Sequence, residues 1–146
     1  MKPANWFALV SLAILVLVAC PMAGAADEPG EASLAERLAG GDRAEADKKR
    51  DPGRKPEEVV AFLGIGPGST VIDLIAAGGY YTEVLSLAVG SEGHVVAQNP
   101  AMVLQFSDGA NEKAISARLA GDRLPNVSRL NIELTELTGS DTQYDA

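Results

Sequence analysis

The stretch TVIDLIAAGGYYTEVLS, residues 70–86, constrains the fold more than any other part of the chain. Aliphatic and β-branched residues from Thr70 to Leu74 indicate a buried strand. A turn of small residues and glycine follows, and Tyr80 to Val89 is predicted to be a helix. Strand, tight turn and helix in this order form a common nucleotide-binding device. The stretch therefore predicts an α/β fold with a candidate site at the carboxyl end of this strand.

The second half of the chain repeats this alternation. A helix is predicted from Pro56, because proline and two following glutamates suit a helix N-terminus. A strand is predicted over His94 to Gln98, a helix from about Asn111 to Leu119, and a third strand over about Val127 to Leu134. The glycines of GIGPGS, residues 64–69, precede the first strand, so they indicate a turn rather than a phosphate loop. The alternation predicts βαβ units in a Rossmann-like, three-layer α/β fold with a parallel sheet.

Residues 1–25 are predicted to be an export signal. A short segment containing Lys2 precedes an apolar run from Trp6 to Ala19, and small residues follow. The run is shorter than the roughly 20 residues of a membrane-spanning helix. Two processing sites compete: an A-x-A pattern ending at Ala25, and a lipobox-like LVAC that would make Cys20 a lipidated N-terminus. Both predict an exported protein, either periplasmic or a lipoprotein, that meets the membrane only through its signal or a lipid anchor.

Residues 26–55 are interpreted as a polar lead-in, and residues 56–146 as the α/β domain. The segment DRAEADKKRDPGRKP, residues 42–56, contains no large apolar side chain. A segment of this kind cannot bury a core face of its own. We therefore expect the lead-in to be an exposed, solvated surface, helical only in part.

Composition excludes several classes of function. The net charge is −8, which disfavours nucleic-acid binding because no excess of positive charge is available to replace phosphate counterions. Cys20 is the single cysteine, so an intrachain disulfide and a thiolate metal cluster are excluded. No carboxylate pair, Ser/His/Asp set or metal-ligand cluster stands out, so neither a catalytic residue nor a metal site is predicted.

The order of helix, Pro-Gly turn, strand ending in Asp73, glycine-containing loop and helix resembles the first motif of class I S-adenosylmethionine-dependent methyltransferases. From Arg50 onward the pattern also resembles a bacterial family of exported predicted methyltransferases, with the signatures GGYYTE at residues 78–83 and QNP at residues 98–100. The resemblance implies a seven-stranded Rossmann-like fold with S-adenosyl-L-methionine as cofactor. It leaves open whether the methyl acceptor is a small molecule or a protein.

The resemblance also assigns residues to the cofactor. Asp73 takes the place of the motif acid, and Ile75, Ala77 and Gly79 take the places of its three glycines, so two of the glycines are replaced. The acid that ends the second strand and holds the ribose would fall at Gln98 or Asn99, and an amide loses the charge-assisted hydrogen bond. Adenine contacts would fall around residues 133–136. The candidate cofactor-binding residues are therefore Asp73, Ile75, Ala77, Gly78, Gly79, Tyr80, Gln98 and Asn99.

The chain ends with SDTQYDA. In the methyltransferase superfamily a Tyr-Asp pair opens the fourth strand, and most catalytic groups lie on that strand and beyond. The resemblance therefore implies a truncated chain that holds the cofactor-binding half of the fold without the catalytic half. The first strand would then be an exposed sheet edge, which invites self-association.

Two other functions stay open. The chain could be an exported, non-catalytic binding or structural module that kept a methyltransferase-like fold. The two replaced glycines, the replaced strand-2 acid and the cytosolic origin of S-adenosylmethionine favour this alternative. The third function is an interaction protein whose sheet is completed by a partner strand.

Overall fold

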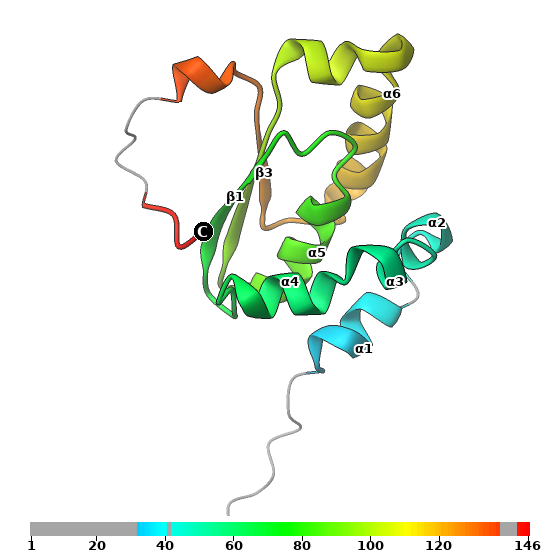
Figure 1. Ribbon diagram of the computed structural model, residues 1–146, viewed down its shortest axis with the longest axis vertical. Helices are drawn as coiled ribbons and strands as arrows, with labels where there is room; N and C mark the ends of the chain where they lie inside the picture. Colours follow the sequence, from blue (N-terminus) through cyan, green and yellow to red (C-terminus); the bar gives the residue numbers. More distant parts are fainter. Residues whose placement is uncertain (1–31, 41, 138–142) are drawn as a thin grey trace, which may run out of the picture. The chain divides into compact units, whose positions relative to one another are not determined.

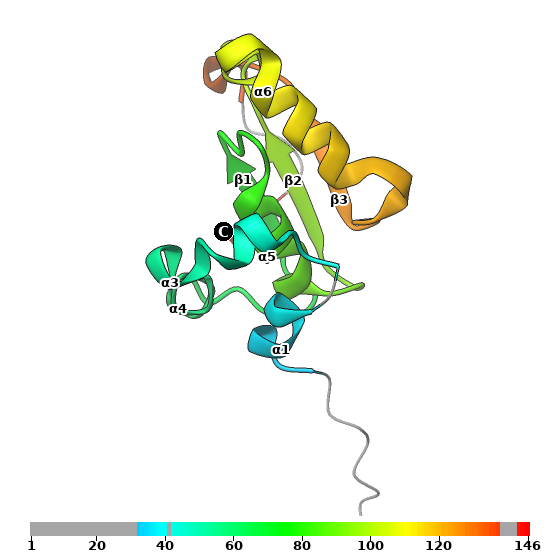
Figure 2. The ribbon, with the colours of Figure 1, turned by 90° about the vertical axis from the view of Figure 1, so that its right-hand side faces the viewer.

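A three-stranded parallel sheet organises the part of the chain that the computed structural model describes, residues 32–40, 42–137 and 143–146. The strands are β1 (Thr70–Leu74), β2 (His94–Gln98) and β3 (Val127–Leu130), and they lie in the order β1-β2-β3 (Figure 2). Both strand pairs are parallel. The predicted α/β, Rossmann-like fold class is confirmed.

Helices precede and connect the strands. They are α1 (Leu34–Ala39), α2 (Glu45–Lys48), α3 (Asp51–Arg54), α4 (Pro56–Phe62), α5 (Tyr80–Val89) and α6 (Ala101–Leu119), with short 3-10 turns η1 (Ala120–Asp122) and η2 (Leu134–Glu136). None of the helices in the described part is long and apolar enough to cross a bilayer. The predicted export signal, both processing sites and Cys20 lie outside the described residues.

One face of the sheet carries the core. Val71, Val95 and Val127 share this face in register, and α5 and α6 lie on the same side of the strands (Figure 1). Sequential strand order with right-handed crossovers places both helices on one face. On the opposite face Ile72 is only half-buried and Leu74 is exposed, so the described residues supply the sheet and one helical layer of the predicted three-layer fold.

Helix α6 is longer than predicted, and strand β3 is shorter than predicted. Helix α6 begins at Ala101, directly after Pro100, and is interrupted by non-helical residues from Phe106 to Gly109. The predicted helix from Asn111 is therefore only its second half. Strand β3 ends at Leu130 rather than near Leu134, because its pairing with β2 ends where β2 ends.

Most described residues of the lead-in are exposed and part of it is helical, as expected, but three of its side chains are buried. Leu38 of α1 is buried in the core with α5, and Arg43 and Asp47 are 3% and 4% exposed. The charges are buried because each has a partner: Arg43 pairs with Asp51 of α3, and Asp47 pairs with Arg118 of α6 at 2.7 Å. An ion pair with Arg118, rather than an apolar face, thus attaches residues 42–56 to the rest of the fold.

Glu83 is the centre of the ion pairs that join the helices. Its carboxylate is 2% exposed and accepts hydrogen bonds from Arg118 and, at 2.5 Å, from Arg123. Arg118 also donates to Asp47 and to the carbonyl oxygen of Gly78. One buried carboxylate therefore holds the α5 helix against the second half of α6.

The end of the chain covers part of the β1 edge. The N–H of Asp145 donates to the oxygen of Thr70 at 2.8 Å, and the N–H of Ile72 donates to the oxygen of Ala146 at 3.0 Å. The Asp145 carboxylate also accepts from the N–H of Thr70. The C-terminus lies beside β1 in Figure 1. The predicted open edge is thus partly paired, by the segment that the resemblance assigns to the start of a fourth strand.

We predict that Glu83→Gln lowers the free energy of unfolding by about 3–5 kcal/mol, because it removes the buried carboxylate that pairs with two partly buried guanidinium groups. Urea unfolding monitored by circular dichroism measures the change. The control is Glu58→Gln, which removes an exposed partner of Lys55 and should change the same quantity by less than about 0.5 kcal/mol. Equal effects of the two variants would contradict a structural role for the Glu83 pairs.

Candidate functional site

A cavity of about 680 Å³ opens at the carboxyl end of β1. Its walls come from β1, the loop of residues 75–79, the start of α5, the lead-in and α6. The lining residues are Asp47, Arg50, Arg54, Asp73, Leu74, Ile75, Ala76, Ala77, Gly78, Tyr80, Tyr81, Ala110, Asn111, Ala114 and Arg118. We call it the loop cavity. Its position is the one at which parallel α/β sheets bind ligands, and its volume lies within the range of small-molecule sites, about 300–1,000 Å³.

The loop of residues 75–79 has a left-handed backbone at three positions. Ile75 has φ 55°, Ala77 has φ 50° and Gly79 has φ 82°. These are the positions that the resemblance assigns to the three motif glycines. A left-handed conformation costs a non-glycine residue roughly 1–2 kcal/mol, and it is rarest for a β-branched side chain. The loop therefore keeps a glycine-type geometry at two residues that do not favour it.

Two buried amides at the end of β2 hold this loop in place. The side chain of Gln98 accepts a hydrogen bond from the Ile75 N–H at 3.1 Å and donates to the oxygen of Ile132 at 2.6 Å. The side chain of Asn99 accepts from the Ala77 N–H at 2.7 Å. Both amides are 0% exposed. Both amides accept a hydrogen bond from the loop backbone, and neither lines the loop cavity.

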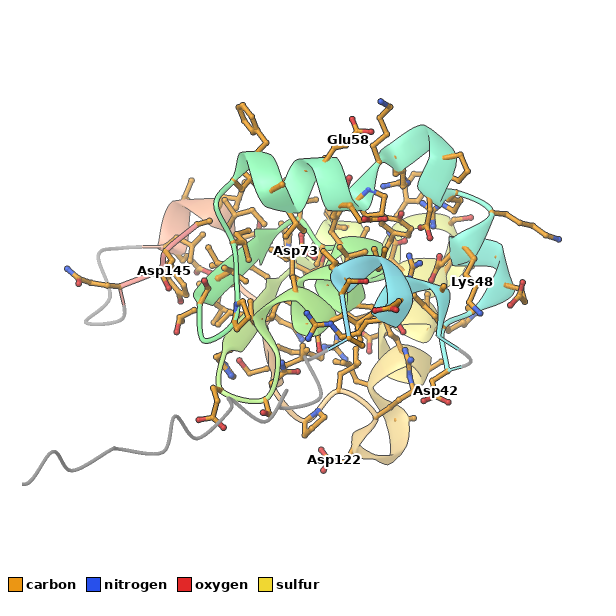
Figure 3. All side chains as sticks on the ribbon, turned by 90° about the horizontal axis from the view of Figure 1, so that it is seen from below. Asp42, Lys48, Glu58, Asp73, Asp122 and Asp145 are labelled. Carbon is orange, nitrogen blue, oxygen red and sulfur yellow. The ribbon has the colours of Figure 1, made fainter. Side chains whose placement is uncertain are left out.

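Asp73 joins β1 to the first turn of α5. The Thr82 hydroxyl donates to its carboxylate at 2.6 Å. Burial raises the pKa of Asp73, and hydrogen bonding from the Thr82 side chain and backbone offsets part of the rise. Figure 3 shows Asp73 within the body of the molecule, whereas Glu58 and Asp122 lie at its periphery. A cationic ligand group in the loop cavity would favour the charged form of this carboxyl.

Backbone N–H groups at the end of the loop and the start of α5 belong to residues that line the loop cavity. Among the described residues, the N–H groups of Gly78, Tyr80 and Tyr81 have no acceptor. Gly79 is tightly packed, since a Cβ there would lie 3.2 Å from the Arg118 Cδ atom. A helix start with free N–H groups attracts an anionic or polar ligand group.

The lead-in adds a wall of arginines that sequence reasoning missed. The guanidinium carbons of Arg43, Arg50 and Arg54 lie 5.4, 4.9 and 4.6 Å from the centre of the Tyr80 ring. The Tyr80 hydroxyl donates to Asp51 at 2.6 Å, and burial raises the pKa of Tyr80 to about 12. In RDPGRKP the i, i+4 spacing of Arg50 and Arg54 could have indicated that the two side chains lie on one helical face. Their contact with Tyr80, which places them at the cavity, could not be inferred from it.

The structure thus brings six of the eight predicted cofactor-binding residues to one place. Asp73, Ile75, Ala77, Gly78 and Tyr80 line the loop cavity, and Gly79 lies within its loop. Residues 133–136, where adenine contacts were expected, form η2 and do not line it. Within the described ranges no group of three or more His, Cys, Asp or Glu side chains could hold a metal ion.

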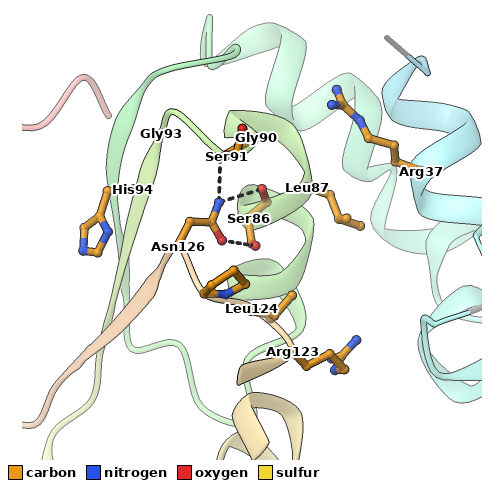
Figure 4. Close-up of a pocket in the computed structure, with 11 residues that line it drawn as sticks. Arg37, Ser86, Leu87, Gly90, Ser91, Gly93, His94, Arg123, Leu124 and Asn126 are labelled. Atoms are coloured by element: carbon orange, nitrogen blue, oxygen red, sulfur yellow. Dashed lines mark hydrogen bonds between the residues drawn. The ribbon is translucent and has the colours of Figure 1, made fainter. Parts of the chain in front are cut away.

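A second hollow of about 530 Å³ lies at the amino end of the sheet, between α5 and the start of β3 (Figure 4). On its wall, Asn126 donates to the oxygens of Ser86 and Gly90 and accepts from the Ser86 hydroxyl. These bonds tie β3 to the end of α5. The hollow is therefore explained by packing.

Two solved structures are similar in part to this chain. A SAM-dependent methyltransferase from Aquifex aeolicus is 29% identical, with a TM-score of 0.46 over 60% of this chain and 46% of that chain. A SAM-dependent O-methyltransferase from Thermotoga maritima is 23% identical, with a TM-score of 0.47 over 75% of this chain and 37% of that chain. The chain thus spans less than half the length of either protein. No family model and no curated protein matches it.

We predict that Ala77→Gly raises the free energy of unfolding by about 0.5 kcal/mol. The strain of a left-handed alanine would be removed, and this gain should exceed the greater loss of backbone entropy that glycine undergoes on folding. The same substitution at an exposed position in the last turn of α6, Ala117→Gly, should lower the free energy of unfolding by up to about 1 kcal/mol. Urea unfolding of both variants measures the difference. Destabilisation of both by similar amounts would show that the Ala77 conformation is unstrained.

We predict a pH-dependent effect of Asp73→Asn. Because burial raises the pKa of Asp73 above 3.8, its charged form destabilises the folded state at neutral pH. The asparagine variant should therefore have a higher melting temperature than the wild type at pH 7, and the difference should vanish near pH 3, where Asp73 is protonated in both the folded and unfolded states. The control is the exposed Asp108→Asn. A lower melting temperature of Asp73→Asn at pH 7 would contradict the prediction.

Proposed function

We propose that the loop cavity binds S-adenosylmethionine and that the chain is the cofactor-binding part of a methyltransferase. The observation that carries the proposal is the loop backbone. Its left-handed residues coincide with the three glycine positions of the motif, although two of them are not glycine. The left-handed conformation that glycine favours is thus present at these positions, which supports the proposal.

The residues of the loop cavity fit the cofactor in two respects. The free N–H groups of Gly78, Tyr80 and Tyr81 would bind its carboxylate, and Asp73 would face its cationic groups. When bound, S-adenosylmethionine supplies a methyl group activated by a positively charged sulfur. The chain's own residues would orient this group, and Tyr81, whose hydroxyl donates to the Arg54 oxygen at 2.8 Å, would keep the lead-in against the site.

The second candidate is the exported binding module. It is favoured by the side chains of Gln98 and Asn99, whose hydrogen bonds to backbone groups leave no acid or free amide at the end of β2 for a ribose. Such a module would accept a ligand of similar size and charge without a ribose. Export itself stays a prediction from residues 1–25.

We predict that the chain binds S-adenosylmethionine in calorimetric titration and that Asp73→Asn weakens binding about tenfold, as expected for loss of one charge-assisted contact. Asp108→Asn should leave binding unchanged. Because Asp73→Asn is expected to stabilise the fold, a weaker affinity cannot be ascribed to unfolding.

Absence of heat at millimolar S-adenosylmethionine and S-adenosylhomocysteine would contradict the proposal. The binding module would then be the better function for the loop cavity.

A further inference from the structure

We propose that Arg50 and Arg54 form an anion site that anchors a carboxylate or phosphate group of the methyl acceptor. This inference rests on the proposed function of the loop cavity. It assigns the acceptor a chemical class, a small molecule or side chain that carries a negative charge apart from the atom that is methylated.

The two arginines are held in place at the cavity. They lie four residues apart on one helical turn, since the N–H of Arg54 donates to the oxygen of Arg50 at 3.0 Å. Both guanidinium groups lie over the ring of Tyr80, which is 5% exposed and fixed through its hydroxyl to Asp51. Stacking on a fixed ring orients a guanidinium before a ligand arrives, which lowers the entropy cost of binding.

The donors of Arg54 are open. Among the described residues no carboxylate pairs with its guanidinium, and its side chain is exposed at the cavity. Arg50 has one partner, Asp47, at 3.2 Å from a single nitrogen. A guanidinium fork binds carboxylate or phosphate with two parallel hydrogen bonds, so the pair offers the donors that such a group requires.

The surrounding charges also favour an anion. Of the charged side chains that line the loop cavity, Arg50, Arg54 and Arg118 are cationic and Asp47 and Asp73 are anionic, which leaves an excess of one positive charge in a chain whose net charge is −8. A local excess of one sign in a concave site raises the local concentration of ligands of the opposite sign.

The cofactor's own carboxylate has other donors. The N–H groups of Gly78, Tyr80 and Tyr81 lie at the loop itself, where the motif places the cofactor. The arginines come from the lead-in, on a different element. The acceptor is therefore the ligand that they fit.

The test follows the arginine side-chain N–H signals by NMR during titration with inorganic phosphate, with and without S-adenosylhomocysteine. Phosphate should shift the signals of Arg50 and Arg54, and Arg54→Gln should weaken phosphate binding about tenfold. The matched control is Lys55→Gln, which removes the same charge one residue away. Because Lys55 pairs with Glu58 and does not line the loop cavity, phosphate affinity should stay within twofold. Neither variant should change S-adenosylhomocysteine affinity more than twofold.

Each other outcome overturns a defined part of the inference. Unchanged phosphate affinity in Arg54→Gln, with an unchanged melting temperature, overturns the anion site. A tenfold loss of S-adenosylhomocysteine affinity in Arg54→Gln assigns the arginines to the cofactor and overturns the acceptor's class. Phosphate binding without any S-adenosylhomocysteine binding overturns the proposed function and the assignment to an acceptor, and leaves a simple anion site.

Discussion

The arrangement of the site depends on the guanidinium group of Arg118. Each of its nitrogens contacts a different segment: Nε the Gly78 oxygen of the loop, Nη1 the Glu83 carboxylate of α5, and Nη2 the Asp47 carboxylate of the lead-in. Replacing a buried ion pair by apolar residues is often neutral, whereas removing one partner is costly. The main contribution of this network is therefore to the arrangement of the site, because it holds the lead-in, the loop and α6 together as three walls of one cavity.

The loop is over-determined in a second way, by hydrogen bonds at the end of β2. A strained left-handed backbone persists only where its surroundings hold it. Here Gln98 accepts from the Ile75 N–H and Asn99 accepts from the Ala77 N–H, so each strained residue has its own buried acceptor. The non-glycine residues of the loop and the amides at the end of β2 are the two places where the sequence departs from the motif that it resembles, and hydrogen bonds join them in the structure.

The parts of the fold that depend on neighbouring residues could be predicted from the sequence. The bounds of β1, α5 and β2 match their predictions, because an apolar run, a glycine turn and a helical segment each form from neighbouring residues. Six candidate residues of the site followed from the same stretch. The packing of the lead-in could not be predicted, because Asp47 is buried by Arg118, 71 positions away along the chain. Charge patterns reveal that pairs can form but not which partners meet.

The loop cavity separates charges of opposite sign, and this separation has a consequence for selectivity. Asp73 at the end of β1 is a partly buried carboxyl with a raised pKa, and a cationic group beside it would favour its charged form. Arg54 stands on the lead-in without a carboxylate partner among the described residues. A cationic group of the cofactor beside Asp73 and an anionic group of the acceptor beside Arg54 would both be favoured, and the reverse placement would be disfavoured at both positions. Discrimination in this site therefore follows from the spacing of charges, which the sheet and the Arg118 contacts hold constant.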